Sequence, residues 1–167
     1  MSERIAVYPG SFDPVTFGHL DILDRAAAIF DSVVVGVLEN PGKTPLFTAE
    51  ERVELLRSCL ETRPGVEVTT FRGLTVEFAA SVGAIAIVRG LRVISDFETE
   101  FQMALMNRRL NPRVNTVFLM TSFSNVFISS SLIKEVCQLG GDVAEMAPSV
   151  SVEAMHRRFA TQRAPHG

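Results

Sequence analysis

Several polar and charged side chains in this sequence come directly after apolar segments, where they could handle phosphate groups. The clearest case is the loop Gly10-Ser11-Phe12-Asp13-Pro14, which leads through Gly18 into His19. An apolar segment precedes this loop, and apolar residues at spacings of three and four follow it, which predicts a strand, a tight loop and a helix. Unpaired N–H groups and the helix dipole at such a helix start favour anions. We therefore expect a phosphate-handling loop with His19 as its chemical residue; the alternative is a plain turn with a solvated histidine.

Further candidate groups follow later apolar segments. Lys43 comes after the segment Ser32–Leu38, and Arg89 and Arg92 flank a Gly-Leu pair after the segment Ala84–Val88. Arginine forks suit phosphate oxygens, and glycine permits a close approach of the backbone. Three serines, Ser129–Ser131, precede another helix and offer hydroxyl and backbone donors together. The alternatives are a solvated pair of arginines and ordinary N-capping, which needs only one serine.

The elements that must position these groups alternate along the chain. Apolar segments predict strands at 5–8, 32–38, 66–71, 84–88 and 116–120. Helices are expected at 20–30, 48–60, 74–82, 95–110, 131–139 and 152–159, two of them opened by the capping boxes Thr48–Glu51 and Ser95–Glu98. This alternation predicts an α/β, Rossmann-like, doubly wound, five-stranded parallel sheet. Its ligand crevice should open at the carboxyl ends of the strands, so neighbouring first and fourth strands would bring the candidate groups together.

Composition and length limit the possible classes of protein. The chain has 167 residues, 47% of them hydrophobic and 21% charged, with a net charge of −3. These values predict a single globular domain, residues 1–160, followed by a mobile tail, residues 161–167. The sequence lacks a basic tract for nucleic acid, an apolar segment long enough for a membrane, and a signal-peptide pattern. We expect a cytoplasmic protein with neither nucleic-acid nor membrane partners.

Several chemistries have no matching residues. Two cysteines and three histidines are too scattered to predict a disulfide or a zinc site. Gly42-Lys43-Thr44 resembles the end of a Walker A motif, but the required first glycine is absent and Pro45 follows. No nucleophile elbow and no dinucleotide-binding fingerprint are present. The basic residues suit direct transfer between two anionic substrates, because a phosphate nucleophile needs no general base.

The order of these motifs also resembles a known family. The loop ending in Thr16-x-Gly18-His19 is similar to the signature of the T/H-x-G-H nucleotidyltransferases. Nearly all of residues 4–159 resemble the bacterial phosphopantetheine adenylyltransferases. The motifs that carry this resemblance are Tyr8–Pro14, Asn40-Pro41-x-Lys43, Phe47-Thr48-x-x-Glu51-Arg52, Arg89–Arg92, Asp96–Glu98, Met106-Asn107, Ile128–Ser131, Lys134–Val136 and Gly140–Val143.

The resemblance implies a function for the chain. The family moves the adenylyl group of ATP to the 4′-phosphate of phosphopantetheine, giving dephospho-coenzyme A and pyrophosphate in coenzyme A synthesis. It implies Mg²⁺ carried with ATP, a homohexamer built as a dimer of trimers, and coenzyme A as an inhibitor that can occupy the site.

It also implies roles for individual residues. The catalytic residues would be His19, Lys43 and Arg92. Phosphopantetheine would be held by Ser11, Lys43, Thr75 and Arg89. ATP would be held by Ser11, Phe12, His19, Gly90, Leu91, Arg92, Glu100, Asn125, Val126, Phe127, Ile128, Ser129, Ser130 and Ser131, with no protein ligand for a metal. Thr99 and Asn125 depart from residues common in the family, so the nucleotide contacts there can differ.

Two other functions remain open at this point. One is another transferase of the superfamily, such as a nicotinamide mononucleotide adenylyltransferase or a glycerol-phosphate cytidylyltransferase. These typically carry histidine at the position of Thr16 and lack the Arg-Gly-Leu-Arg and Ile-Ser-Ser-Ser pairing. The other is a non-catalytic nucleotide sensor, against which an intact His19, Lys43 and Arg89 argue.

Overall fold

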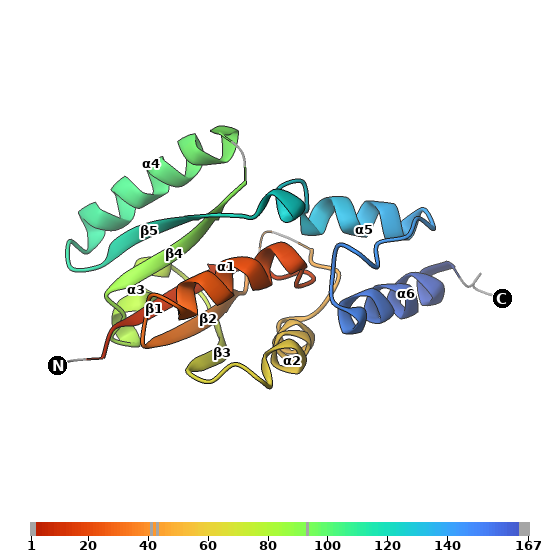
Figure 1. Ribbon diagram of the computed structural model, residues 1–167, viewed down its shortest axis with the longest axis horizontal. Helices are drawn as coiled ribbons and strands as arrows, with labels where there is room; N and C mark the ends of the chain where they lie inside the picture. Colours follow the sequence, from red (N-terminus) through yellow and green to blue (C-terminus); the bar gives the residue numbers. More distant parts are fainter. Residues whose placement is uncertain (1–2, 41, 43, 93, 164–167) are drawn as a thin grey trace.

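The computed structural model describes residues 3–163 apart from residues 41, 43 and 93, and gives only the backbone of residues 94–96 and 162–163. Strands and helices alternate over most of this length (Figure 1). The elements are β1 (Ile5–Gly10), α1 (Phe17–Ala27), β2 (Ser32–Leu38), α2 (Ala49–Leu60), β3 (Val66–Phe71), α3 (Thr75–Ser81), β4 (Ala86–Leu91), α4 (Ile94–Leu110), β5 (Asn115–Met120), the 3-10 helix η1 (Phe123–Asn125), α5 (Ser130–Gln138) and α6 (Ser149–Arg163).

The strands form one sheet in the order β3-β2-β1-β4-β5, and every pair is parallel. This confirms the predicted fold class. It also meets the condition for a shared crevice, because β1 and β4 are neighbours in the sheet. The loop after β1 and the end of β4 therefore open on the same edge.

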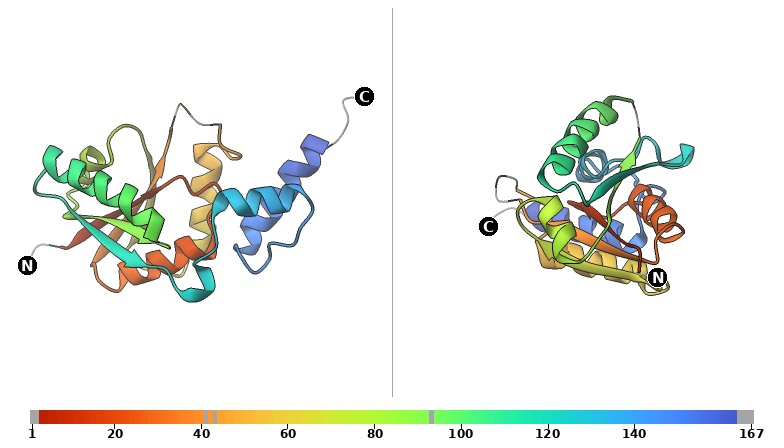
Figure 2. Two further views of the ribbon diagram at one scale, coloured as in Figure 1. Left: turned by 90° about the horizontal axis from the view of Figure 1, so that it is seen from above. Right: turned by 90° about the vertical axis from the view of Figure 1, so that its left-hand side faces the viewer.

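Successive residues of the central strands point to opposite faces, and each face has its own core. Ala6 and Tyr8 of β1 pack with residues of α1, α2, α5 and α6 on one face. Val7 packs with residues of α3 on the other. Figure 2 shows α3 and α4 on one side of the sheet and α1 on the other. Strands buried on both faces explain the unbroken apolar segments in the sequence.

The fourth strand differs from the prediction. It runs from Ala86 to Leu91, so Arg89 and Gly90 lie within the strand, paired with Phe118 and Leu119 of β5, and not in a loop beyond it. The pairing with β5 continues the ladder because a parallel neighbour is available on this side. Gly90 is required at this point, since a Cβ there would lie 2.9 Å from Cγ1 of Ile22 in α1.

Helix ends differ more than strand ends. The capping box of α2 is confirmed, because Glu51 N–H donates to Thr48 Oγ1 at 3.2 Å and Thr48 N–H donates to Glu51 Oε2 at 2.8 Å. Helix α4 begins at Ile94, before the expected cap Ser95, whose side chain lies outside the described part. Helix α6 runs from Ser149 to Arg163 and so includes residues placed in the expected tail. Residues 164–167 lie outside the described residues, and the boundary after residue 160 stays a prediction.

Helices α5 and α6 extend the molecule beyond the carboxyl edge of the sheet (Figures 1 and 2). Arg158 of α6 forms an ion pair with Glu51 and lies 5.3 Å from the centre of the Phe47 ring, which fastens α6 to the start of α2. Within the described residues, no helix is both long enough and apolar enough to span a membrane.

Candidate active site

Two adjoining cavities open at the carboxyl edge of the sheet. One, of about 490 Å³, is lined by Tyr8, Pro9, Gly10, Ser11, Phe12, Thr16, Gly18, His19, Ile22, Arg89, Gly90, Arg92, Thr99, Glu100, Thr121, Ile128 and Ser129–Ser131. The other, of about 600 Å³, lies against the ends of β2 and α2 and contains Asp13, Glu39, Arg52 and Lys134. Ser11, Ser130 and Ser131 line both cavities. We call the first the histidine cavity and the second the loop cavity.

His19 is held in a defined orientation by the start of α1. Thr16 caps this helix, and its hydroxyl oxygen accepts a hydrogen bond from the backbone N–H of His19 at 3.3 Å. In return, Nδ1 of His19 accepts from the backbone N–H of Thr16 at 3.1 Å. Since Nδ1 is an acceptor, the single proton of a neutral imidazole ring is on Nε2.

The charge state of His19 follows from its surroundings. Burial of the ring and the positive charges of Arg92 and Arg89 lower its pKa to about 4. The ring is therefore neutral near pH 7, with Nδ1 already engaged. It can act as an Nε2–H donor, but not as a general base through Nδ1.

An aromatic side chain supports the histidine from behind. Phe12 is buried and lies edge-on to His19, with ring centres 4.9 Å apart. Its backbone has a φ of 49°, in the left-handed region, and its side chain belongs to the hydrophobic core. A Cβ on Gly10 would lie 3.0 Å from this ring, so a larger residue there would push against Phe12. The expected nucleotide residue Phe12 thus lines the cavity and also supports the loop from within the core.

Arg89 and Glu100, which the family resemblance assigns to different substrates, contact each other. Nε and Nη2 of Arg89 donate to the two carboxylate oxygens of Glu100 at 2.6 and 2.5 Å. Nη1 donates to the carbonyl oxygen of Pro9 at 3.0 Å. This arrangement joins β4, α4 and the end of β1 at the wall of the histidine cavity.

Arg92 and the serines join the last loop to the others. Nη1 of Arg92 donates to the carbonyl oxygen of Ile128 at 3.2 Å. Ser129 caps α5 by accepting from the N–H of Leu132 at 3.2 Å, and Ser130 Oγ donates to the carbonyl oxygen of Pro14 at 2.8 Å. Ordinary capping therefore explains only the first of the three serines. The loop after β1 and the start of α5 form one wall.

The structure brings most of the predicted residues together, but not all of them. Leu91 is buried in β4, and Thr75 begins α3, outside the linings of both cavities. Asn125 donates to Ser122 Oγ within its own loop, and it, Val126 and Phe127 also lie outside both linings. Lys43 lies outside the described residues. The roles of these residues stay predictions.

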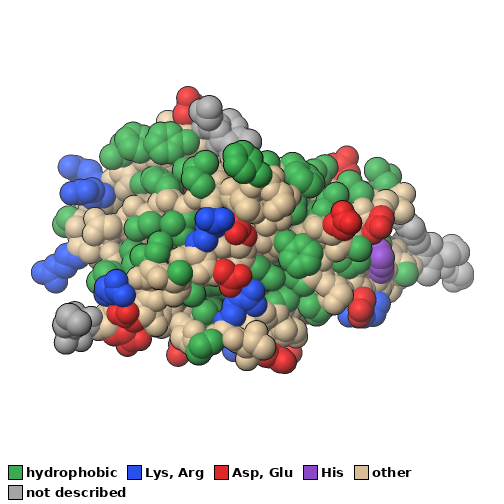
Figure 3. Space-filling model, viewed as in Figure 1, with side chains coloured by type: hydrophobic (Ala, Val, Ile, Leu, Met, Phe, Trp, Pro, Cys, Tyr) green, Lys and Arg blue, Asp and Glu red, His purple; other side chains and the backbone are tan. Residues whose placement is uncertain are grey.

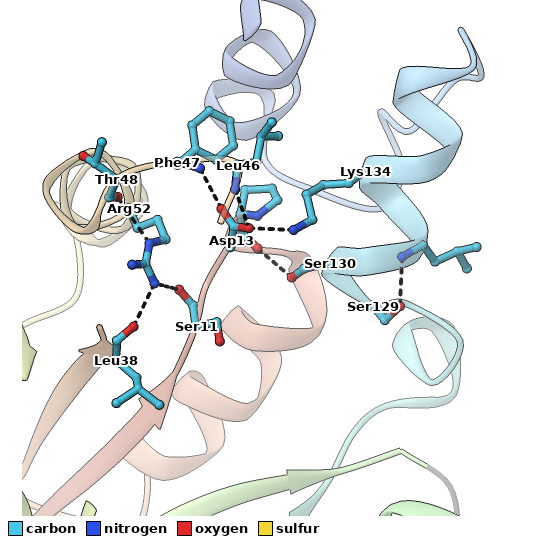
Figure 4. Close-up of polar contacts among 12 residues, drawn as sticks. Ser11, Asp13, Leu38, Leu46, Phe47, Thr48, Arg52, Ser129, Ser130 and Lys134 are labelled. Atoms are coloured by element: carbon cyan, nitrogen blue, oxygen red, sulfur yellow. Dashed lines mark hydrogen bonds and ion pairs between the residues drawn. The ribbon is translucent and has the colours of Figure 1, made fainter. Parts of the chain in front are cut away.

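Three charged residues that organise the site were not assigned roles from sequence (Figure 4). The buried carboxylate of Asp13 accepts from the N–H groups of Leu46 and Phe47, both at 2.9 Å, and from Nζ of Lys134 at 2.6 Å. It joins the loop after β1 to the start of α2 and to α5.

Arg52 forms a second set of hydrogen bonds that connect the loops of the site (Figure 4). It is buried on α2 and donates to the carbonyl oxygens of Ser11 at 2.7 Å, Leu38 at 3.1 Å and Thr48 at 3.2 Å. Its spacing of three and four from Leu55 and Leu56 places it on the apolar side of α2, which is the signal that could have revealed a buried arginine.

The parallel sheet and the loop that presents a neutral histidine beside two arginines are features of a nucleotidyltransferase. Residues 7–136 match the cytidylyltransferase-like family. The phosphopantetheine adenylyltransferase of Caldanaerobacter subterraneus is 54% identical over 93% of this chain and 98% of its own length. The enzymes of the same name from Heliobacterium modesticaldum and Alkaliphilus metalliredigens are 54% and 49% identical, each over 93% of this chain and over 92% and 99% of their own lengths. The chain belongs to the phosphopantetheine adenylyltransferase family.

Proposed function

We propose that this enzyme transfers the adenylyl group of ATP to the 4′-phosphate of phosphopantetheine by direct in-line displacement. An oxygen of the acceptor phosphate forms a bond to the α-phosphorus, and the bond from that phosphorus to the bridging oxygen breaks. Pyrophosphate leaves with the electron pair, and dephospho-coenzyme A is formed for coenzyme A synthesis. No covalent enzyme intermediate is needed.

The observation that carries the mechanism is the hydrogen bond from Thr16 N–H to Nδ1 of His19. It leaves Nε2–H as the free donor of the ring, and His19 lines the histidine cavity together with Ser11 and Arg92. In our proposal this donor meets the charge that builds on the α-phosphoryl oxygens in the transition state. A neutral donor suits this task, because the acceptor phosphate is already deprotonated and needs no base.

The remaining roles follow the two sides of the site. On the acceptor side, Arg89, Lys43, Thr75 and Ser11 would hold phosphopantetheine. On the nucleotide side, Arg92, Gly90 and the residues 125–131 would hold ATP, with the backbone and hydroxyl donors at the start of α5 facing its phosphates. Ser11 lines both cavities, which supports its expected contact with both substrates.

We treat Mg²⁺ as part of the substrate, bound to the phosphates of ATP. In the described part of the chain, no group of three or more histidine, cysteine, aspartate or glutamate side chains is placed to hold an ion. Asp13 and Glu100, two carboxylates that line these cavities, are engaged by Lys134 and Arg89. The residues described therefore do not fit a dedicated metal site, and no step is assigned to one.

The assembly we propose is a homohexamer formed as a dimer of trimers, in the cytoplasm, with coenzyme A able to occupy the site. Support comes from α4, whose large apolar side chains remain exposed: Phe97, Phe101, Met103, Leu105, Met106 and Leu110. Hydrophobic side chains gather over this helix (Figure 3). A helix apolar on several sides is usually covered on several sides, and a second copy of the chain would supply the cover.

Product analysis tests this function directly. The purified chain is incubated with MgATP and phosphopantetheine, and products are identified by mass and by release of pyrophosphate. Dephospho-coenzyme A and pyrophosphate in equal amounts are expected. Nicotinamide mononucleotide and glycerol phosphate serve as rival acceptors, and turnover with either one alone, or with no acceptor at all, contradicts the proposal.

A further inference from the structure

The bidentate pair between Arg89 and Glu100 limits what each side chain can do. A guanidinium group has five N–H donors. On Arg89, two of these N–H groups donate to Glu100 and one donates to the carbonyl oxygen of Pro9. The other two N–H groups, one on each terminal nitrogen, remain for a ligand. Both residues line the histidine cavity. The engaged edge thus fixes the plane of the guanidinium, while its terminal nitrogens keep donors for a ligand.

Glu100 is the group that fixes this plane. Its side chain is 19% exposed and that of Arg89 is 34% exposed, so the pair lies at the cavity wall and not in open solvent. Both carboxylate oxygens accept short hydrogen bonds from Arg89. A bidentate pair removes the rotational freedom that a single contact would leave. Pro9 O adds a third anchor from β1, on the side of the guanidinium that faces the reacting loop.

We propose that Glu100 is a positioning residue for the acceptor: it orients Arg89 so that the two remaining N–H groups bind the phosphate of phosphopantetheine. This inference rests on the proposed function, and it deepens that function at one residue. It differs from the role that family resemblance gives Glu100, which is contact with ATP. It also places part of the acceptor site on α4, because the carboxylate that holds the arginine comes from this helix.

The proposal predicts which substrate a change at Glu100 affects. Glu100→Gln keeps the shape of the side chain, but its amide nitrogen cannot accept from a guanidinium, so the bidentate pair is lost. The KM for phosphopantetheine should rise by ~10-fold or more, while the KM for ATP changes by less than about 2-fold. Arg89→Lys should show the same pattern, because lysine cannot form the fork.

The decisive measurement is a double-mutant cycle with both KM values determined at every corner. The variant with both changes should bind phosphopantetheine no worse than Arg89→Lys alone, since Glu100 acts through Arg89. Glu98→Gln, an exposed carboxylate on the same helix, is the matched control and should leave both KM values unchanged. Calorimetric titration of phosphopantetheine without ATP should repeat the loss seen in KM.

Three results would overturn the inference. A rise in the KM for ATP alone would place Glu100 on the nucleotide. A lower melting temperature with both KM values unchanged would show that the pair of Arg89 and Glu100 contributes only to stability. Additive effects of the two substitutions on the KM for phosphopantetheine would show that Glu100 and Arg89 act independently. Failure of the proposed function is distinguishable from all three, because it would appear in the unmodified enzyme as absent turnover with phosphopantetheine.

Discussion

Nδ1 of His19 lies 3.1 Å from the backbone nitrogen of Thr16 and 3.1 Å from its hydroxyl oxygen. Both contacts lie on the same edge of the imidazole ring, so the other edge, with Nε2–H, is the one available to substrates. His19 is therefore both a part of the cap of α1 and the proposed chemical group of the site. A change at either residue alters the start of α1 and the orientation of the ring together.

Removing the imidazole should mainly affect the chemical step. His19→Ala deletes a donor that we place on the transition state, so kcat should fall by ~10²–10³-fold, as for loss of one oxyanion donor. ATP binding, measured by calorimetry, should change much less. His156→Ala, on the exposed part of α6, is the control. A His19→Ala enzyme with nearly normal kcat would remove His19 from the mechanism.

The low pKa of His19 predicts an unusual pH dependence. Burial, Arg92 and Arg89 lower it to about 4, so the ring stays neutral in the folded protein well below the ordinary value of 6.5. Between these two values the unfolded chain binds the additional proton, so stability from this residue is lost as the pH falls from about 6.5 towards 4. The ring resonances, followed by NMR, should titrate near 4, and kcat should not rise on acidification through 6.5. A midpoint near 6.5 contradicts the prediction.

Arg52, a charged residue buried on α2, should contribute to the stability of the folded protein. Arg52→Met would remove the side-chain donor from the carbonyl oxygens of Ser11 and Leu38, at a cost of about 1–3 kcal/mol for each group left unpaired, whereas the carbonyl oxygen of Thr48 keeps the backbone N–H of residue 52. Urea unfolding should show the loss in the free energy of unfolding. Arg57→Met, at an exposed position on the same helix, should cost much less. Equal losses in the two variants would show that the buried contacts add nothing.

Ser151, unlike Arg52, is a buried polar residue whose removal should not destabilise the protein. Its hydroxyl oxygen, fully buried on α6, is without a hydrogen-bond partner among the described residues. Ser151→Ala removes a desolvated polar group, so the melting temperature should stay the same or rise, with activity unchanged. Ser81→Ala, which deletes a hydroxyl that donates to Phe78 O at 2.8 Å, is the comparison and should not stabilise. Clear destabilisation by Ser151→Ala would reveal a partner for the hydroxyl.

Assembly through α4 can be tested at Leu105, which is 55% exposed in the single chain. Leu105→Glu would bury an unpaired charge at a contact between copies and should split the assembly, as measured by light scattering. Ile29→Glu, at an exposed apolar residue in the turn after α1, should leave the assembly intact. A monomeric unmodified protein at micromolar concentration would refute the proposed hexamer.

Local patterns in the sequence were sufficient to predict the fold. The apolar, β-branched segment Ser32–Leu38 matches β2, because a strand buried on both faces needs no alternation. The bounds expected for Val66–Phe71 also match β3, an edge strand whose burial alternates along the chain. The extension of β4 through Arg89 could not be read locally, since it depends on pairing with β5. The expected α/β topology then placed His19, Arg89, Arg92 and the serines along one crevice.

The ties that hold the site together were harder to predict. A capping box is recognised by Glu or Gln at its fourth position, so the reciprocal pair of Thr16 and His19 did not fit the pattern. Asp13 and Lys134 are far apart in the sequence, and no spacing rule connects them. The pairing of Arg89 with Glu100 depends on how α4 packs against β4, which only the folded chain reveals.

The segment between β2 and α2 is anchored at both of its ends. Arg52 holds the carbonyl oxygen of Leu38 at one end, and Asp13 holds the N–H groups of Leu46 and Phe47 at the other. The segment thus begins at a held carbonyl oxygen and ends at two held N–H groups, so sequence changes between these anchors need not move the loop after β1. Substitutions around Lys43 within residues 39–45 can then change acceptor preference without rebuilding the catalytic loop, which makes this segment the natural place for substrate diversity on this scaffold.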